Sequence, residues 1–368
     1  MDAWGFVEDD MRNQPLVSII VTNYNYGRFL NEAINTALNQ TYPNTEVVVV
    51  DDGSTDNSQE IIVSYGDRIV PVFKENGGMS SACNAGFAAS RGEIVIFLDA
   101  DDYLFPCAVE RVVAAWEPDV VKVHYRLQEV DALGNPLGEL YPPRHKALDS
   151  GVVWPILLER VHYVTCTTSG NGFARGVLAQ LLPIPEAEFK NWADTYLNYS
   201  VPFHGKIGSI DEALGAYRIH GSNVWSLGEL SSGRFRMFVR MYLQIHTLIA
   251  REANEMGYKV PRDLDLRDHE LWSLRLASLR LDPQNHPVPS DRPLRLTYSG
   301  LRSIWQYSEF NWKQRLLFSS WFVWVGLLPL PVTKPAIALQ FLPQSRPRAI
   351  DWVIRKIRSR QTLSAIKA

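Results

Sequence analysis

Cysteine is scarce in this sequence of 368 residues, which has three. Cys83, Cys107 and Cys166 show no Cys-x-x-Cys spacing and their number is odd, which excludes a disulfide framework and a cysteine-built zinc site. We therefore expect a reducing, cytoplasmic compartment. The first ten residues are acidic and lack an apolar core, so we expect no secretory signal there.

The sequence also has no excess of basic residues over acidic ones. Lys and Arg number 37 against 40 Asp and Glu, which gives a formal net charge of −3. Because proteins that bind nucleic acid neutralise phosphates with a basic surface, we expect no nucleic-acid partner. The length allows one large domain with an appendage or two modest domains.

The first hundred residues show a regular alternation of apolar runs and helical segments. Four nearly all-apolar runs predict strands buried on both faces, at 16–21, 47–50, 69–73 and 94–98. Segments with helical spacing lie between them, at 29–38, 59–65 and 80–89. This order predicts an α/β fold with a mostly parallel, Rossmann-like sheet flanked by helices. Ligands bind at the carboxyl ends of the strands in such sheets, so site residues should follow these runs.

Acidic residues follow two of the predicted strands. They are Asp51, Asp52, Asp99, Asp101 and Asp102. Crowded carboxylates repel unless a cation shares them, and Mg²⁺ typically binds one or two carboxylates together with substrate phosphates. The set therefore favours a metal that neutralises a diphosphate. The alternative is that Asp51, Asp52 and Asp102 cap the helices that follow them.

Motifs of other diphosphate-binding folds are missing. The first strand leads into Thr22-Asn-Tyr-Asn-Tyr-Gly27 instead of a Gly-x-Gly-x-x-Gly turn, and no P-loop motif occurs anywhere. Tyr24 offers an aromatic face on which a base could stack, worth about 1–3 kcal/mol. Asp52 could accept the N–H groups of a uracil or a guanine. A nucleotide-diphosphate donor is the simplest ligand that would use the polar residues at the ends of the predicted strands.

Several motifs of residues 16–102 resemble those of the family 2 glycosyltransferases, which have the GT-A fold. They are Val17-Ser-Ile-Ile-Val-Thr-Asn-Tyr-Asn25, Ala37-Leu-Asn-Gln-Thr-Tyr-Pro43, Glu46-Val-Val-Val-Val-Asp-Asp-Gly-Ser-Thr-Asp56, Asn84-Ala-Gly86 and Gly92-Glu-Ile-Val-Ile-Phe-Leu-Asp-Ala-Asp-Asp102. The resemblance implies a GT-A-type sheet, here with a C-terminal helical extension. It also implies an inverting transfer from a nucleotide-diphosphate-sugar.

The resemblance implies roles for individual residues. Thr22, Tyr24 and Asp52 would contact the nucleoside, Asp99 the ribose or uridine side, and Asp101 would be the main ligand of Mg²⁺ or Mn²⁺. The remaining members of the expected donor-binding set are Asn25, Gly78, Asn84 and Ala100.

One residue departs from the family pattern. Cys83 stands where the family often has an arginine that helps to hold the donor. We expect Cys83 to be a small buried apolar group. Neutralisation of the donor's diphosphate is then left to the metal.

Two further segments resemble family segments. Phe189–Leu197 matches the region of the general base, with Ala193 at the position of the family's Glu and Asp194 as the candidate base. The alternative is that Asp194 is a solvated first-turn carboxylate. His220, in the segment 216–223, would ligate the metal or bond the leaving phosphate, and a solvated loop histidine is the alternative. The expected acceptor residues are Ser169, Asn171 and Trp192.

The end of the sequence differs in character from the rest. Residues 316–333 carry no charge, and Pro329 and Pro331 make a membrane-spanning helix there a poor expectation. Residues 344–368 hold seven basic residues and one acidic residue, a net charge of +6 that leaves −9 for residues 1–343. Together they predict a segment that lies on an anionic leaflet, the inner face of the cell membrane. A soluble helical subdomain with a solvated basic tail is the alternative.

The sequence predicts four parts. They are a leader (1–14), a GT-A domain (15–225, with a nucleotide half at 15–102 and an acceptor half at 103–225), a helical extension (226–310) and an apolar, basic, membrane-associating tail (311–368).

The leading hypothesis is a metal-dependent inverting glycosyltransferase with hexosyl-type transfer. Its acceptor would be a hydroxyl of a glycan or a lipid-linked precursor, in cell-surface polysaccharide biosynthesis. Cys83 and Ala193 support an alternative, a non-catalytic nucleotide-sugar-binding protein of the same fold. A nucleotidyltransferase is disfavoured by the loop after the first strand.

Overall fold

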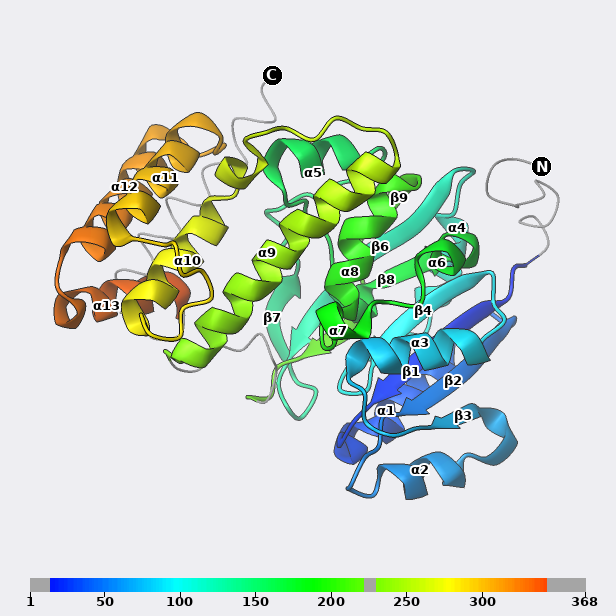
Figure 1. Ribbon diagram of the computed structural model, residues 1–368. Helices are drawn as coiled ribbons and strands as arrows, with labels where there is room; N and C mark the ends of the chain where they lie inside the picture. Colours follow the sequence, from blue (N-terminus) through cyan, green and yellow to red (C-terminus); the bar gives the residue numbers. More distant parts are fainter. Residues whose placement is uncertain (1–13, 222–229, 343–368) are drawn as a thin grey trace. The chain divides into compact units, whose positions relative to one another are not determined.

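The computed structural model describes residues 14–221 and 230–342. Their contacts divide them into two compact units, one of residues 14–155 and 163–220 and one of residues 156–162, 221 and 230–342. The first unit is α/β and the second is helical (Figure 1). The predicted leader (1–14) and the basic tail beyond residue 342 lie almost entirely outside the described residues.

The four predicted N-terminal strands are present. They are β1 (Val17–Asn23), β2 (Thr45–Asp51), β3 (Val70–Phe73) and β4 (Ile94–Asp99), all parallel, in the order β3-β2-β1-β4. The prediction of burial on both faces is wrong for β3, which is a largely exposed strand at the edge of the sheet. Between them lie α1 (Gly27–Leu38), α2 (Ser58–Ser64) and α3 (Met79–Ala89). The register places Thr22 beside Asp99 and Asn23 beside Asp51. The strand ends that carry the predicted site residues therefore meet at one edge of the sheet.

The same sheet continues with strands of mixed direction. Beyond β4 the order is β8 (Asn171–Ala174), β6 (Val120–Val130), β9 (Lys206–Arg218) and β5 (Tyr103–Leu104), and β7 (Pro136–Tyr141) pairs with β6. Strands β6 and β9 are parallel, whereas β8 runs antiparallel to both of its neighbours. The other helices of this unit are α4 (Ala108–Ala114), α6 (Arg175–Leu181), α7 (Glu186–Phe189) and α8 (Ala193–Ser200), whereas α5 (Trp154–Arg160) has most of its residues in the second unit. The sheet is thus parallel in the nucleotide half and mixed in the second half.

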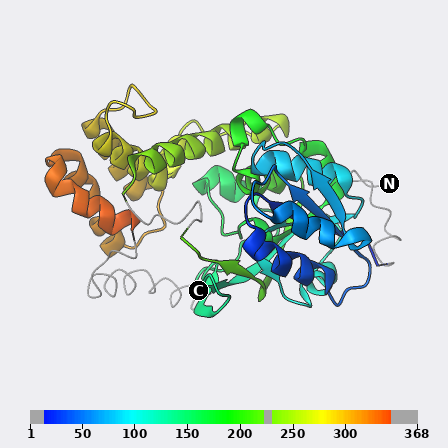
Figure 2. The same ribbon diagram turned by 90° about the horizontal axis from the view of Figure 1, so that it is seen from below.

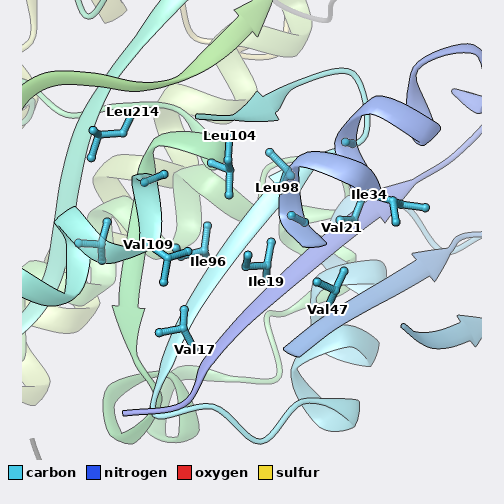
Figure 3. Packing of buried hydrophobic residues seen from close by; sticks show 14 of the residues in the cluster. Val17, Ile19, Val21, Ile34, Val47, Ile96, Leu98, Leu104, Val109 and Leu214 are labelled. Carbon is cyan, nitrogen blue, oxygen red and sulfur yellow. The ribbon is translucent and has the colours of Figure 1, made fainter. Parts of the chain in front are cut away.

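The core lies between the sheet and the helices on one of its faces. Ile19, Val21 and Ile96 point from the strands into a cluster that also contains Ile34 of α1 and Val109 of α4 (Figure 3). This alternation along β1 is what a strand covered by helices on both faces requires.

Helix α3 covers the opposite face at very short range. A Cβ atom added to Gly86 of α3 would lie 2.3 Å from Cγ2 of Ile20 and 3.0 Å from Cγ2 of Val50. Glycine at this position therefore lets α3 approach β1 and β2, which brings the N-terminus of α3 to the edge that carries the aspartates.

The second unit is built from helices that pack against their neighbours in the sequence. Its helices are α9 (Ser232–Glu255), α10 (His269–Leu281), α11 (Pro293–Gln306), α12 (Trp312–Leu327) and α13 (Leu330–Phe341). The uncharged run at 316–333 falls on α12 and the start of α13, which lie side by side in two views (Figures 1 and 2). Within residues 14–221 and 230–342, none of the helices combines the length and the apolar character needed to cross a bilayer.

Candidate functional site

Three carboxylates gather where β4 ends. One oxygen of each of Asp99, Asp101 and Asp102 lies within 4.8 Å of the others. Burial, with the charges of Asp101 and Asp194, raises the pKa of Asp99 to about 8. Burial and the charges of Asp101 and Asp99 also raise the pKa of Asp102 well above its usual range. Carboxylates crowded in this way favour a shared cation, and oxygen ligands suit Mg²⁺ and Mn²⁺.

His220 joins this cluster from a distant part of the chain. Its Nε2 lies 2.8 Å from Oδ2 of Asp101, and its ring packs against Tyr26 and Phe29. The His220 side chain is only 1% exposed, so it is not a solvated loop histidine. The predicted metal ligands Asp101 and His220 are therefore in contact.

The Asp102 carboxylate is buried and forms hydrogen bonds within the protein. Its carboxylate accepts hydrogen bonds from Ser169 Oγ (2.6 Å) and from the backbone N–H of Arg218 (2.9 Å). It does not cap the next helix, because α4 begins at Ala108 with Cys107 at the cap position. The Arg218 guanidinium in turn binds Glu32 and the carbonyl of Asp101, so it buttresses the loop after β4.

Asp52 organises the turn that begins α3. It accepts hydrogen bonds from the backbone N–H groups of Gly77 (3.0 Å) and Gly78 (2.7 Å), and Lys74 Nζ lies 2.5 Å from its Oδ1. The capping alternative for α2 is wrong, since Asn57 occupies that cap. Gly78 has φ +92°, and a Cβ atom there would lie 2.7 Å from Cγ of Lys190. Sequence reasoning missed Lys74, although its place directly after β3 is a signal that could have found it.

Most of the other predicted donor-binding residues shape this edge through contacts of their own. Tyr24 is 46% exposed, which leaves its ring open to a base. Thr22 Oγ1 lies 3.5 Å from Oδ1 of Asp99, and the backbone N–H of Ala100 donates to the Thr22 carbonyl (3.1 Å). Asn25, with φ +58°, accepts from the backbone N–H of Thr55 (2.7 Å).

Asn84 ties α3 to the segment before α7. Its side chain accepts from the Ile184 N–H (2.8 Å) and donates to the Ile184 carbonyl (3.1 Å). Ser80, near the start of α3, similarly binds the carbonyl of Phe189 at 2.5 Å. These contacts join the nucleotide half to the chain that leads into α8.

Asp194 stands in the first turn of α8, which begins at Ala193. Burial raises its pKa, and the backbone N–H and hydroxyl of Thr195 and the hydroxyl of Thr167 oppose this effect. Asp194 is therefore not a freely solvated helix-capping carboxylate.

Cys83 is fully buried, which confirms the prediction of a small buried group. Burial raises the pKa of its thiol well above the usual value, and the charges of Asp99, Asp194 and Asp52 add to this rise. The negative charges of these three carboxylates thus act on the position where the family often has an arginine.

The predicted acceptor residues are all buried. Ser169 is fully buried; its Oγ accepts from the backbone N–H of Asp99 (3.1 Å) and donates to Asp102. Asn171 is 1% exposed and donates to the Thr167 carbonyl at 2.5 Å. Trp192 is 9% exposed and occupies the cap position of α8. Composition predicted a polar acceptor loop; the side chains of Ser169 and Asn171 form hydrogen bonds within the protein, and an acceptor role for these residues stays a prediction.

Lys122 of β6 is a buried cation that sequence reasoning missed. Its Nζ donates to Tyr163 Oη (2.9 Å), Thr165 Oγ1 (2.8 Å) and the side-chain carbonyl of Asn198. Burial lowers the pKa of Lys122 to about 7. Asn198 lies one helical turn after Asp194 on α8, so Lys122 anchors the helix that carries the candidate base. A lysine flanked by valines, at Val121 and Val123, was the available signal.

Comparison with known proteins identifies the family. A model described as "Glycosyl transferase family 2" matches residues 18–156. Residues 18–156 belong to glycosyl transferase family 2. An uncharacterized glycosyltransferase of Nostoc sp. (strain PCC 7120) is 40% identical over 212 residues, 56% of this chain and 66% of that one. The hyaluronan synthase of Pasteurella multocida is 44% identical over 108 residues, 28% of this chain and 11% of that one. The chain thus matches only part of the length of these relatives.

A solved structure shares the fold of this chain. S. aureus TarS 1–349 in complex with UDP-GlcNAc superposes with a TM-score of 0.54 at 16% identity, covering 88% of this chain and 91% of that chain. The predicted GT-A-type α/β fold with a C-terminal helical region is confirmed.

Proposed function

We propose that the protein is a metal-dependent inverting glycosyltransferase with hexosyl-type transfer from a nucleotide-diphosphate-sugar to a hydroxyl. One observation carries the proposal: Asp52 after β2, Asp99 and Asp101 at the end of β4, and Asp194 in the first turn of α8 converge at the carboxyl edge of a family 2 sheet. Ligands of open α/β sheets bind at this edge.

The donor set at the end of β4 fits Mg²⁺ or Mn²⁺. Asp101 and Asp99 supply oxygen ligands, and His220, already in contact with Asp101, supplies an imidazole. A bound metal stabilises the negative charge of the departing diphosphate.

The chain's own residues bind and orient the donor. The exposed ring of Tyr24 stacks on the base. The Asp52 carboxylate, which accepts hydrogen bonds from the N–H groups of Gly77 and Gly78, also accepts an N–H of the base. Lys74 lies beside Asp52 and donates to the carbonyl of the base next to that N–H. Inverting transfer forms a bond between the acceptor oxygen and the anomeric carbon as the bond to the diphosphate breaks. Asp194 takes the proton from the acceptor hydroxyl, a role that its raised pKa favours.

The acceptor in this proposal is a glycan or a lipid-linked precursor in cell-surface polysaccharide biosynthesis. The similarity to a hyaluronan synthase over 108 residues supports a glycan product. The basic sequence 344–368 supports a cytoplasmic protein that is peripheral on the anionic inner face of the cell membrane.

A donor screen tests the proposal. The full chain is heated with UDP- and GDP-sugars, UDP-GlcNAc included, in Mn²⁺, Mg²⁺ or EDTA. A donor at 100 times its Kd stabilises the protein by about 2.7 kcal/mol. We expect one class of donor to raise the Tm only with metal, and the same donor to release nucleoside diphosphate slowly in water and faster with acceptor. Binding without release would instead indicate a nucleotide-sugar-binding protein, and no binding at all would refute the proposal.

A further inference from the structure

Helix α12 exposes an almost entirely apolar face. Trp312, Leu316, Val323 and Leu327 recur at helical spacing along it, and each is between 42% and 65% exposed. Leu317 and Trp324, which flank this stripe, are 40% and 47% exposed. Single exposed apolar side chains are ordinary, but several of them on one helix face, here interrupted only at Ser319 and Ser320, mark an interaction surface.

The opposite face of α12 is the one that packs inside the helical unit. Phe322 and Val325 are 1% and 0% exposed. A Cβ atom added to Gly300 of α11 would lie 2.1 Å from Cε1 of Phe322, and one added to Gly326 would lie 1.8 Å from Oγ1 of Thr297. Helix α12 is thus seated tightly on α11 through small residues. Among the described residues, nothing further covers its apolar face.

Neighbouring helices extend this face. Trp305 of α11 is 48% exposed and its Nε1 donates to Ser319 of α12 (3.0 Å). Trp324 Nε1 donates to the carbonyl of Val332 of α13 (3.2 Å), and Val332 is itself 48% exposed. We call the following set the tryptophan patch: Trp305, Trp312, Leu316, Leu317, Val323, Trp324, Leu327, Leu328 and Val332.

The stretch of sequence that forms the tryptophan patch is rich in basic residues. Residues 292–342 contain six basic side chains and one acidic one, Glu309, which is paired with Arg160 at 2.7 Å. The basic residues are Arg292, Arg295, Arg302, Lys313, Arg315 and Lys334. The sequence that follows, 344–368, carries a net charge of +6. Like charges disfavour both this segment and a second copy of the chain as the occupant of the patch, whereas an anionic surface is complementary to it.

We propose that the tryptophan patch docks on an anionic lipid bilayer, with α12 lying in the interface. Tryptophan suits this position because its ring is apolar and its N–H is polar, and basic side chains beside it bind anionic headgroups. The proposal concerns the helical unit alone and does not rest on the proposed glycosyltransferase activity.

Vesicle binding of the full chain tests the proposal. The vesicles contain phosphatidylglycerol and phosphatidylcholine in equal parts, or phosphatidylcholine alone, and in a second set the lipids are brominated near the headgroup. We expect sedimentation with the anionic vesicles and quenching of tryptophan fluorescence by the brominated lipid. The double variant Trp312→Ser/Trp324→Ser should bind about tenfold more weakly or worse, since two large apolar side chains are lost.

Controls separate the patch from other causes. Leu133→Ser removes an 86%-exposed apolar side chain of the α/β unit and should leave vesicle binding unchanged. Retained far-UV circular dichroism shows that the double variant is folded. Equal vesicle binding by the double variant would overturn the proposal in favour of the basic segment acting alone. If analytical ultracentrifugation showed a dimer for the unaltered protein and a monomer for the double variant, a second copy of the chain would be the occupant and the proposal would be overturned.

Discussion

His220 Nε2 lies 2.8 Å from Asp101 Oδ2, although 119 positions separate the two residues in the sequence. The contact joins the loop after β9 to the loop after β4, and it fixes the orientation of a carboxylate that remains 14% exposed. The contact thus places the imidazole of His220 beside the aspartate that we propose as the main metal ligand, where both side chains can serve the same ion.

Removing the Asp101 carboxylate should abolish metal-dependent donor turnover. Asp101→Asn is expected to lower kcat by about 100-fold or more, because charge stabilisation at the leaving group is lost. His220→Gln should weaken metal activation by about 10- to 100-fold. Turnover is followed as nucleoside diphosphate release across a Mn²⁺ titration. Asp67→Asn, an exposed carboxylate outside the site, should behave as the unaltered protein. Full Mn²⁺-dependent turnover by Asp101→Asn would contradict the assignment.

Asp194→Asn should separate chemistry from donor binding. General-base catalysis contributes about 10²–10⁴-fold, so we expect kcat to fall by that factor. The donor Kd, measured by calorimetry, should stay within about twofold, because Asp194 is assigned to the acceptor hydroxyl. Glu188→Gln in α7, an exposed carboxylate close in sequence, is the matched control. An unchanged kcat in Asp194→Asn would remove Asp194 as the base.

The sequence predicted the nucleotide half well because buried parallel strands leave a strong trace. The run Val47–Val50 is all apolar, and aspartates follow it directly, so both the strand and the site edge could be located. The register of β1 with β4 then brings Thr22 beside Asp99 as expected.

Side-chain directions in the second half could not be predicted. Ser169 lies in a polar loop typical of a binding surface, yet it points inward to Asp102, because the pairing of β8 with β4 and β6 buries this loop. The partners of Asp52 were also hidden, since its contacts with Gly77 and Gly78 depend on a turn made 25 residues later. Such contacts follow from tertiary packing, of which local sequence carries little trace.

Thiol labelling should distinguish Cys107 from the other two cysteines. Cys107 is exposed, whereas Cys83 and Cys166 are buried and burial raises the pKa of both thiols. Because the thiolate is the reactive form, a disulfide reagent should label one equivalent in the native protein and three after unfolding. Cys107→Ser should remove the native signal. Rapid labelling of Cys83 in the folded protein would contradict the burial of its thiol.

Lys122→Met should destabilise the α/β unit in a pH-dependent way. Burial lowers the pKa of Lys122 to about 7, against about 10.4 in the unfolded chain. Between these values the unfolded state holds a proton that the folded state has released, so stability rises with pH across this window. We expect the variant to lose about 1–3 kcal/mol where the amine is neutral, because Asn198 loses its donor, and to lose less where it is charged. Urea unfolding at about pH 6 and about pH 9 measures this difference. Equal losses at both values would contradict a buried, shifted Lys122.

The helical unit should lose stability in alkaline solution through His246. Its Nε2 lies 2.9 Å from Oδ2 of buried Asp268, and Asp268 also caps α10. Burial opposes the charged imidazole, but bonds to Asp265 and Asp268 raise the pKa of His246 to about 9, against about 6.5 when unfolded. The stabilisation is fully present below about pH 6.5 and is lost as pH rises through about 9. Asp268→Asn should cost about 3–5 kcal/mol at about pH 6 and flatten this dependence.

A graded control accompanies that experiment. The Asp265 side chain is 74% exposed, so Asp265→Asn should cost less than Asp268→Asn and retain most of the pH dependence. The free energy of unfolding is measured by urea titration monitored by far-UV circular dichroism in each variant. If Asp268→Asn kept the alkaline loss of stability at full size, the charged His246–Asp268 pair would not be its origin.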